Sequence, residues 1–446
     1  MTTPVLEQVD PATLRKVIVA AAIGNFVEWF DFAVYGFLAT TIAQQFFPSG
    51  DASAALLKTF AVFAVAFAFR PLGGVFFGML GDRIGRKRTL AFTILLMAGA
   101  TTIIGLLPTY AAIGVMAPVL LTLIRCAQGF SAGGEYAGAC AYLMEHAPRT
   151  QRAWYGSFVP VSTFSAFAAA AIIAYALEAS LSTEAMGSWG WRLPFLIAAP
   201  LGLVGLYLRW KLDETPAFQA VKQEHAVAHS PLKETLRNHG AAICCLGAFV
   251  SLTALSFYMF TTYFATYLQV AGGLSRATAL LVSLIALLFA AAICPAAGAF
   301  SDKIGRRKTV LSTCVLLIVV VYPSFLMASS GSFVASIVGV MLLAIGAVLC
   351  GVVTAALLSE TFPTRTRYTA SAITYNMAYT IFGGTAPLMA TWLIGATGSN
   401  LAPAFYLIVI ALLALAGGLA LPETSKVSLH EVEGSLTGRG RLQTAV

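Results

Sequence analysis

The feature that most constrains this chain is that three short polar signatures occur twice, in the same order, between long apolar stretches. The copies are Gly78-x-x-x-Asp82-Arg83-x-Gly85-Arg86-Lys87 and Gly298-x-x-x-Asp302-Lys303-x-Gly305-Arg306-Arg307, Glu145-x-x-Pro148-x-x-x-Arg152 and Glu360-x-x-Pro363-x-x-x-Arg367, and Leu212-x-Glu214-Thr215 and Leu421-x-Glu423-Thr424. Their offsets of 220, 215 and 209 residues are nearly equal, which indicates a duplicated half. Parallel repeats in a membrane protein are typical of two-halved transporters.

Composition excludes a water-soluble fold. Of the 446 residues, 59% are hydrophobic and only 10% are charged, whereas a soluble domain carries roughly 25% charged residues. The apolar stretches have the length of about 20 residues that crosses a bilayer as a helix, and they do not alternate as the strands of a barrel do. We therefore expect an all-α polytopic membrane protein with twelve transmembrane helices in two six-helix bundles.

The apolar stretches set the expected boundaries. The spans are 17–42, 56–80, 89–107, 113–137, 154–178, 191–210, 240–269, 277–300, 309–329, 332–358, 368–395 and 402–420. They divide the chain into a first bundle (1–212), a cytoplasmic linker (213–239), a second bundle (240–424) and a tail (425–446). The histidines of the linker are simpler to explain as solvated loop residues than as metal ligands, and no Cys or His spacing elsewhere predicts a metal site.

The basic residues predict the orientation. The segments on the side of both termini hold 22 of the 27 Lys and Arg residues, so by the positive-inside rule both termini are expected in the cytoplasm. The net charge of +8 therefore indicates short loops facing anionic lipid and not a nucleic-acid partner.

The first signature has a mechanical interpretation. Gly78 ends a span where backbones can approach closely, Asp82 can cap or pair near a helix N-terminus, and Gly85 permits a tight turn. Both copies would form a latch between the halves that breaks when the halves rock. The expected gating residues are Gly78, Asp82, Arg83, Gly85 and Arg86 with Gly298, Asp302, Lys303, Gly305 and Arg306. The alternative is a plain basic loop.

The first span carries two carboxylates. Glu28 and Asp31 lie three residues apart on one helical face, and Tyr35 follows one turn beyond Asp31. A charge at the centre of a membrane helix costs about 2.5–3.5 kcal/mol, so two of them indicate contact with water, a partner or a proton. The alternative is that they only pair with basic residues to hold helices together.

The candidate partners are Arg70 in the second span and Arg125 in the fourth. Arg125 is the better candidate for a carboxylate clamp or a proton-relay partner. Glu135 lies ten residues further along, about 15 Å nearer the cytoplasm at 1.5 Å per residue. The second half offers neutral groups instead, among them Tyr258, Tyr263 and Asn376. We expect the charge coupling in the first half and neutral walls in the second.

These motifs resemble a known family. The repeated loop resembles that of the major facilitator superfamily, and four further segments resemble its metabolite:H⁺ symporter family. They are Gly24-Asn25-x-x-Glu28-Trp29-x-Asp31-Phe32-x-x-Tyr35, Arg70-Pro71-Leu72-Gly73-Gly74, Gln128-Gly129-Phe130-Ser131-x-Gly133-Gly134-Glu135-Tyr136 and Trp189-Gly190-Trp191-Arg192-Leu193-Pro194-Phe195. The resemblance implies a proton-driven symporter of the bacterial inner membrane.

The resemblance and the charge placement together give the expected site. Proton coupling is expected at Glu28, Asp31, Arg125 and Glu135. Substrate contacts are expected at Asn25, Trp29, Tyr35, Arg70, Gln128, Tyr258, Tyr263 and Asn376. In the expected mechanism a carboxylate takes up a proton, its pairing with Arg125 loosens, and the halves rock about the site.

The substrate is less sharply indicated. Residues 202–218 are most similar to proline/glycine betaine transporters, whereas Ile381-Phe382-Gly383-Gly384 is similar to the α-ketoglutarate and citrate members. Two acids and two bases near the cavity suit a zwitterion or a small carboxylate. A drug:H⁺ exporter is disfavoured because the fifth span lacks the expected glycine signature, and an enzyme because no nucleophile elbow or P-loop occurs. We expect a monomer in the lipid bilayer with a small-molecule substrate, H⁺ as the coupling ion and no cofactor.

Overall fold

The computed structural model describes residues 11–48, 52–211, 231–363, 366–425 and 427, and all regular structure in them is helical. Within these residues, ten segments are long and apolar enough to cross a membrane. Helices α1 and α6, with 27 and 31 residues, are long enough as well, which makes twelve spans. The expected all-α fold is confirmed.

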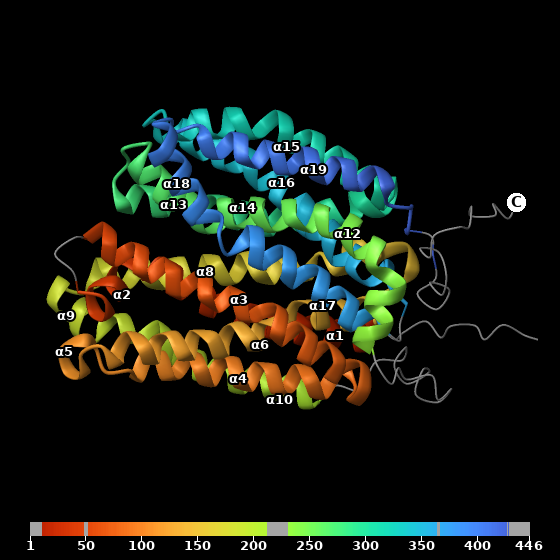
Figure 1. The fold of residues 1–446 in the computed structure, drawn as a ribbon, viewed down its shortest axis with the longest axis horizontal. Helices are drawn as coiled ribbons and strands as arrows, with labels where there is room; N and C mark the ends of the chain where they lie inside the picture. The colour runs from red at the N-terminus through yellow and green to blue at the C-terminus, as the bar shows by residue number, and fades with distance from the viewer. Residues whose placement is uncertain (1–10, 49–51, 212–230, 364–365, 426, 428–446) are drawn as a thin grey trace, which may run out of the picture.

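The first bundle is built from the helices of residues 11–210. These are α1 (Pro11–Phe37), α2 (Ala39–Phe46), α3 (Ala52–Ile84), α4 (Arg86–Leu106), α5 (Tyr110–Ile113), α6 (Met116–His146), α7 (Arg152–Gly156), α8 (Phe158–Ser180), α9 (Thr183–Ser188) and α10 (Leu193–Trp210), with 3-10 turns at Arg149–Gln151 and Gly190–Arg192. Figure 1 shows them lying alongside the second bundle.

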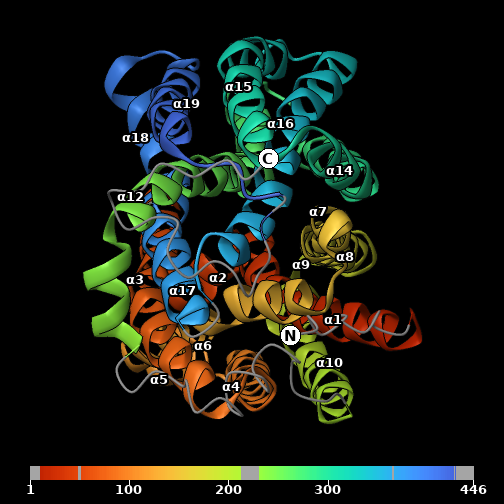
Figure 2. The same cartoon turned by 90° about the vertical axis from the view of Figure 1, so that its right-hand side faces the viewer.

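The second bundle follows from residue 231. Its helices are α12 (Pro231–Tyr258), α13 (Phe264–Val270), α14 (Arg276–Ile304), α15 (Arg306–Ala328), α16 (Phe333–Glu360), α17 (Arg367–Ala378), α18 (Ala386–Thr397) and α19 (Ala402–Ala420). Two π-helical segments, Met259–Tyr263 and Tyr379–Gly383, join α12 to α13 and α17 to α18. Seen end-on, the helices form two groups that meet along α3, α17, α8 and α14 (Figure 2).

Two of the expected spans have different boundaries in the structure. The first span divides at Leu38 into α1 and α2. The span expected to begin at 240 begins at Pro231, because proline is favoured in the first turn of a helix, where its missing N–H is not needed. The rest of the expected linker, like most of the expected tail, lies outside the described residues.

Glycines allow α3 and α6 to lie very close together. A Cβ atom at Gly129 would collide with the backbone of Ala66, and one at Gly133 would collide with the backbone around Arg70 and Gly74. Small residues are favoured at such crossings because they let membrane helices approach. The close crossing brings Arg70 of α3 next to the polar residues of α6.

This packing predicts a position-dependent effect of adding one methyl group. Gly129→Ala is expected to lower the thermal unfolding temperature of the detergent-purified protein, because overpacking a tight contact costs about 1–3 kcal/mol. Gly99→Ala is the matched control: it is also a helical glycine, but a Cβ there meets nothing within 4 Å. Equal unfolding temperatures for the two variants would contradict the close crossing.

Candidate functional site

The two carboxylates of α1 are buried at the centre of the first bundle. Glu28 is 2% exposed and Asp31 is 1% exposed. Helix α1 packs against α4, α6, α8 and α10 and also touches the first π-helical segment of the other bundle. The two side chains turn to different neighbours, so that each carboxylate belongs to a separate polar chain.

Glu28 pairs with Arg70, and the pair reaches the second bundle. Glu28 Oε1 lies 3.3 Å from Arg70 Nη2. Arg70 Nε donates to Asn376 Oδ1 at 3.3 Å, and Asn376 Nδ2 donates to the carbonyl of Gly133 at 2.6 Å. Asn376 thereby holds α17 against both α3 and α6, and it connects a buried ion pair of one bundle to the other bundle.

Aromatic rings surround the Arg70 guanidinium. Its central carbon lies 5.3–5.9 Å from the ring centres of Trp29, Phe32, Phe67, Tyr375 and Tyr379. Cation–π contacts of this kind are worth about 2 kcal/mol or more when the cation is desolvated. The rings come from both bundles, so the aromatic environment of Arg70 depends on how the bundles are arranged.

Asp31 is linked to Arg125 through two intermediate side chains. Thr101 Oγ1 donates to Asp31 Oδ2 at 2.6 Å, Gln128 Nε2 donates to Thr101 Oγ1 at 2.5 Å, and Arg125 Nη1 donates to Gln128 Oε1 at 2.8 Å. The guanidinium also lies 4.1 Å above the ring of Tyr35. The expected mechanism has a carboxylate that pairs directly with Arg125. In the structure Asp31 reaches Arg125 through a relay of Thr101 and Gln128, and Glu28 pairs with Arg70.

Several buried polar atoms around this relay lack a hydrogen-bond partner among the described residues. They are Asp31 Oδ1, Arg125 Nε, Arg125 Nη2 and the hydroxyl of Tyr258. Tyr258 interacts electrostatically with both Arg70 and Arg125. Buried polar groups without partners are costly, and here the unused groups are mostly donors, which suits an anionic ligand atom.

The other expected site residues take different places. Asn25 donates to Ser162 at 2.8 Å and to Thr163 at 2.7 Å, which ties α1 to α8, and it accepts from Trp29 at 3.1 Å. The hydroxyl of Tyr35 donates to the carbonyl of Thr59. Tyr263 packs 6.0 Å from the ring of Tyr267, away from the arginines. The side chains of Glu135 and Arg86 lie outside the described residues.

The two π-helical segments begin directly beside the aromatic cluster. Tyr258 precedes the first, and Tyr379 opens the second. Their rings lie 6.0 Å apart, and Tyr379 stacks on Tyr375 at 3.9 Å. Wide turns of this kind are frequent at functional sites. No sequence signal pointed to them.

The repeated loops cap helices of the opposite bundle. Asp82 of α3 accepts from the backbone N–H and the hydroxyl of Thr369 at the start of α17, at 3.0 and 2.7 Å. Asp302 of α14 accepts from the backbone N–H groups of Ala153 and Trp154 in α7, at 3.0 and 2.8 Å. A carboxylate at a helix N-terminus satisfies unpaired donors and complements the helix dipole.

The glycines of these loops permit the tight turns and the close contacts between the bundles. Gly85 and Gly305 have φ angles of 103° and 96°, a region that favours glycine. Gly78 lies against Thr369, and Gly298 lies against Ala153 and Trp154. Arg83 and Lys303 are exposed. We call the end of the molecule that carries these loops the signature end.

The second repeated signature also joins the bundles at the signature end. Arg367 pairs with Glu145 at 2.9 Å, and Arg152 pairs with Glu360 at 3.7 Å, so each copy supplies a carboxylate to the arginine of the other copy. Arg306 adds two bonds of 3.0 Å to Glu360. Sequence reasoning found this repeat but not its pairing, although a repeated acid and base in each half is the signal that could have suggested it.

Glu423, from the third signature, accepts from the backbone N–H groups of Arg306 and Arg307 at 2.8 and 3.1 Å. Partial burial alone would raise the pKa of this carboxyl, but the hydrogen bonds from Ser425, Arg306 and Arg307 outweigh it and hold the pKa below its usual range. The carboxylate therefore stays ionised and caps α15.

A cavity of about 240 Å³ lies between the bundles toward the end opposite the signature end. Phe32 and Gly36 of α1, Phe167 of α8, Thr262 and Gln269 line it together with residues of α3 and α14. The ring of Phe32 also lies 5.5 Å from Arg70 and 5.1 Å from Arg125. Phe32 therefore separates the cavity from the buried charges.

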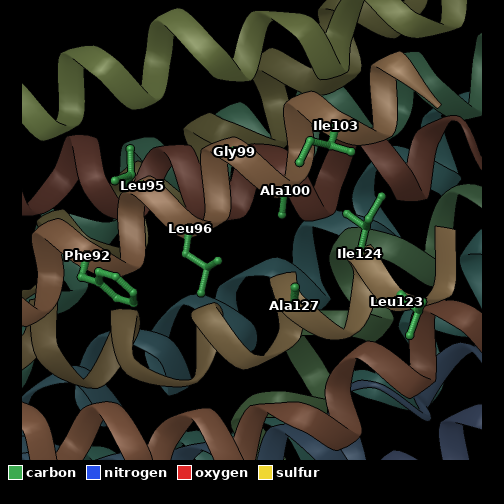
Figure 3. Close-up of a pocket in the computed structure, with 9 residues that line it drawn as sticks. All are labelled: Phe92, Leu95, Leu96, Gly99, Ala100, Ile103, Leu123, Ile124 and Ala127. Carbon is green, nitrogen blue, oxygen red and sulfur yellow. The ribbon is translucent and has the colours of Figure 1, made fainter. Parts of the chain in front are cut away.

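A second cavity, of about 460 Å³, lies between α4 and α6 and is lined by apolar residues only (Figure 3). Leu95 and Leu123 on its rim are more than half exposed, as expected of a groove that faces lipid. Its lining residues Ala100 and Ala127 directly precede Thr101 and Gln128 in the chain. The groove offers no polar group to a hydrophilic substrate.

Comparison with known proteins places the chain in a family. Residues 21–387 and 277–439 match the Major Facilitator Superfamily. The proline/betaine transporter of Salmonella typhimurium is 38% identical over 427 residues, which are 94% of this chain and 85% of the relative. The glycine betaine/proline/ectoine/pipecolic acid transporter OusA of Dickeya dadantii is 38% identical over 431 residues, 94% of this chain and 86% of the relative.

Among solved structures, the proton:xylose symporter XylE bound to 6-bromo-6-deoxy-D-glucose superposes with a TM-score of 0.80 at 17% identity, over 95% of this chain and 98% of that chain. At this identity the likeness shows the fold alone. These comparisons confirm the resemblance inferred from the motifs.

The Glu28–Arg70 pair predicts non-additive effects on stability. Glu28→Gln is expected to lower the thermal unfolding temperature strongly, because an unpaired buried charge costs about 3–5 kcal/mol and an arginine cannot release its proton. Arg70→Gln is expected to cost less, because a carboxyl can be neutralised by protonation. The double variant is expected to recover part of the loss, and the exposed Glu184→Gln should have no effect. Additive losses in the double variant would contradict a paired arrangement.

Proposed function

Since the chain belongs to the Major Facilitator Superfamily, we propose that it is a proton-coupled symporter that imports a small zwitterion such as proline or glycine betaine. Its curated relatives are named transporters of these solutes. One polypeptide contains both bundles around the central residues, so a monomer is sufficient for this function. The proton is the coupling ion, and no cofactor is required.

The observation that carries this proposal is the balance of buried charge inside the first bundle. The charges of Glu28 and Asp31 cancel those of Arg70 and Arg125, and all four side chains are at most 2% exposed. One added proton leaves one uncompensated positive charge in a medium of low dielectric constant. The carboxylate of a zwitterion can compensate it locally, while the ammonium group of the zwitterion lies against the aromatic rings. Proton and substrate therefore favour each other's binding, as symport requires.

The arrangement of the two ends supports import. The signature end is closed by helix caps and ion pairs between the bundles, while the 240 Å³ cavity lies toward the opposite end. From the positive-inside rule we expect the signature end in the cytoplasm and the cavity toward the outside of the inner membrane. Substrate would enter through this cavity, pass Phe32 and reach the arginines before the caps open.

The zwitterion is favoured over a dicarboxylate or tricarboxylate by the same balance. A substrate with a net charge of minus two or three needs more positive charge than Arg70 and Arg125 supply, since both already face carboxylates. The aromatic rings around the arginines also suit a quaternary or secondary ammonium group. An α-ketoglutarate- or citrate-type symporter is the second candidate.

The proposal predicts substrate-specific uptake in proteoliposomes. With the outside more acidic by one pH unit and the membrane potential clamped, labelled glycine betaine or proline is expected to accumulate about tenfold at one proton per substrate. A protonophore should abolish the accumulation. α-Ketoglutarate and citrate are the comparison substrates, and uptake of either of them alone would overturn the zwitterion assignment.

The buried carboxylates predict a loss of uptake driven by the pH gradient when either is neutralised. Asp31→Asn and Glu28→Gln are expected to lose accumulation driven by the pH gradient, because neither variant side chain can take up and release a proton. Glu184→Gln, on the exposed surface, is the control and should accumulate substrate like the wild type. Retained gradient-driven accumulation in both carboxylate variants would show that the proton binds elsewhere.

A further inference from the structure

The hydroxyl of Thr101 lies between two acceptors and one donor. It is 2.6 Å from Asp31 Oδ2 and 3.0 Å from the carbonyl oxygen of Met97, one turn earlier in α4. Gln128 Nε2 approaches the same oxygen at 2.5 Å. Thr101 is fully buried, so these three groups are the ones it can use.

The donor and acceptor groups of the neighbouring side chains fix the direction of each hydrogen bond in the relay. Arginine only donates hydrogen bonds, so the amide oxygen of Gln128 must face Arg125 and its N–H₂ group must face Thr101. Thr101 Oγ1 is therefore always an acceptor toward Gln128. Its single proton remains free to point either at Asp31 or at the carbonyl of Met97.

The choice between these two positions depends on the charge of Asp31. When Asp31 is ionised, the hydroxyl proton points at the carboxylate, because a charged acceptor makes the stronger bond. When a proton arrives on Asp31 Oδ2, that O–H must donate to Thr101, and the hydroxyl proton turns to the carbonyl of Met97. No covalent bond of Thr101 breaks, and both states leave its hydrogen-bonding groups satisfied.

We propose that Thr101 is a positioning residue that switches between these two states and, through Gln128, transmits the protonation of Asp31 to Arg125. This inference rests on the proposed function. With Asp31 ionised, Thr101 is polarised and holds Gln128, and thus Arg125, within the relay. With Asp31 protonated, this hold weakens and Arg125 loses its counter-charge. Its unpartnered Nε and Nη2 then bind the substrate carboxylate.

The surroundings of Asp31 are consistent with control by this relay. Arg125 of α6 is the charge that acts on it, and Tyr35, Tyr258 and Cys126 face that guanidinium in turn. The Glu28–Arg70 pair lies one turn away on α1 and α3. Helix α8 presents the neutral Ser162 and Thr163 to α1.

A matched control lies next to Thr101 in the chain. Thr102 makes the same backbone bond one turn back, to the carbonyl of Ala98 at 2.7 Å, whereas the hydroxyl bond to Asp31 comes from Thr101. Thr101→Val removes the hydroxyl and keeps the shape, Thr101→Ser restores the hydroxyl, and Thr102→Val tests the loss of a threonine from α4.

Three transport properties separate the relay from a structural role. In Thr101→Val, exchange of labelled for unlabelled glycine betaine at equal pH is expected to stay within about threefold of wild type. Accumulation driven by a pH gradient should fall to equilibration, and the pH dependence of KM should flatten. Thr101→Ser and Thr102→Val should retain all three properties.

Infrared titration of the carboxyl band that disappears in Asp31→Asn gives a measurement independent of transport. In Thr101→Val the ionised Asp31 carboxylate loses its hydrogen bond from Thr101. This loss is expected to raise the pH midpoint of the Asp31 titration by about one to two units. Thr102→Val should leave the midpoint unchanged.

The outcomes distinguish this inference from the proposed function. Gradient-driven uptake by Thr101→Val with an unaltered pH profile and an unaltered midpoint would overturn the relay alone. Equal loss of exchange and accumulation in Thr101→Val and Thr101→Ser would assign Thr101 a structural role and also overturn it. A wild type without gradient-driven uptake of any zwitterion would overturn the proposed function and the relay with it.

Discussion

The rest of the structure depends on the compensation of buried charge around α1. Two carboxylates on one membrane helix are tolerated only because each reaches an arginine, Glu28 directly and Asp31 through two neutral side chains. This requirement explains the close crossing of α3 and α6, since Gly129 and Gly133 let the two arginine-bearing helices approach. It also explains why the aromatic rings gather here, because they exclude water while still stabilising the cations.

The second constraint is that the two bundles must bind each other and still be able to separate. The contacts at the signature end are carboxylates at helix N-termini and exchanged acid–base pairs. Bonds of this type are replaced by water when the bundles separate, so they cost little to break and re-form. A continuous apolar interface would lack this property. The duplication supplies these contacts twice. The closed signature end is therefore symmetric between the bundles, although the central residues of the two bundles differ.

The sequence predicted the features that depend on composition and on short residue spacing. It did not predict the side-chain contacts that depend on how each helix is rotated about its axis. Twelve spans, the duplication and the two carboxylates within α1 follow from runs and charges. The partner of Glu28 does not, because Arg70 and Arg125 lie at accessible depths and only the rotation of α3 and α6 selects between them. Thr101 gave no signal, since a threonine in a membrane helix usually bonds its own backbone. Asn25 carries a motif, yet its bonds tie α1 to α8.

The asymmetry of the bundles suggests how a local proton could move a whole domain. The second bundle contributes Asn376, Tyr375 and Tyr379, which touch Arg70 but carry no charge. Asn376 accepts from Arg70 Nε while Glu28 faces Arg70 Nη2, so one guanidinium connects the carboxylate to the second bundle. A neutral partner is suited to this task. In the proposed symport it would respond to the position of the charge without competing with the carboxylates for the proton. In the proposed symport, charge in one bundle and polarisable, uncharged contacts in the other would thus divide proton binding from domain movement.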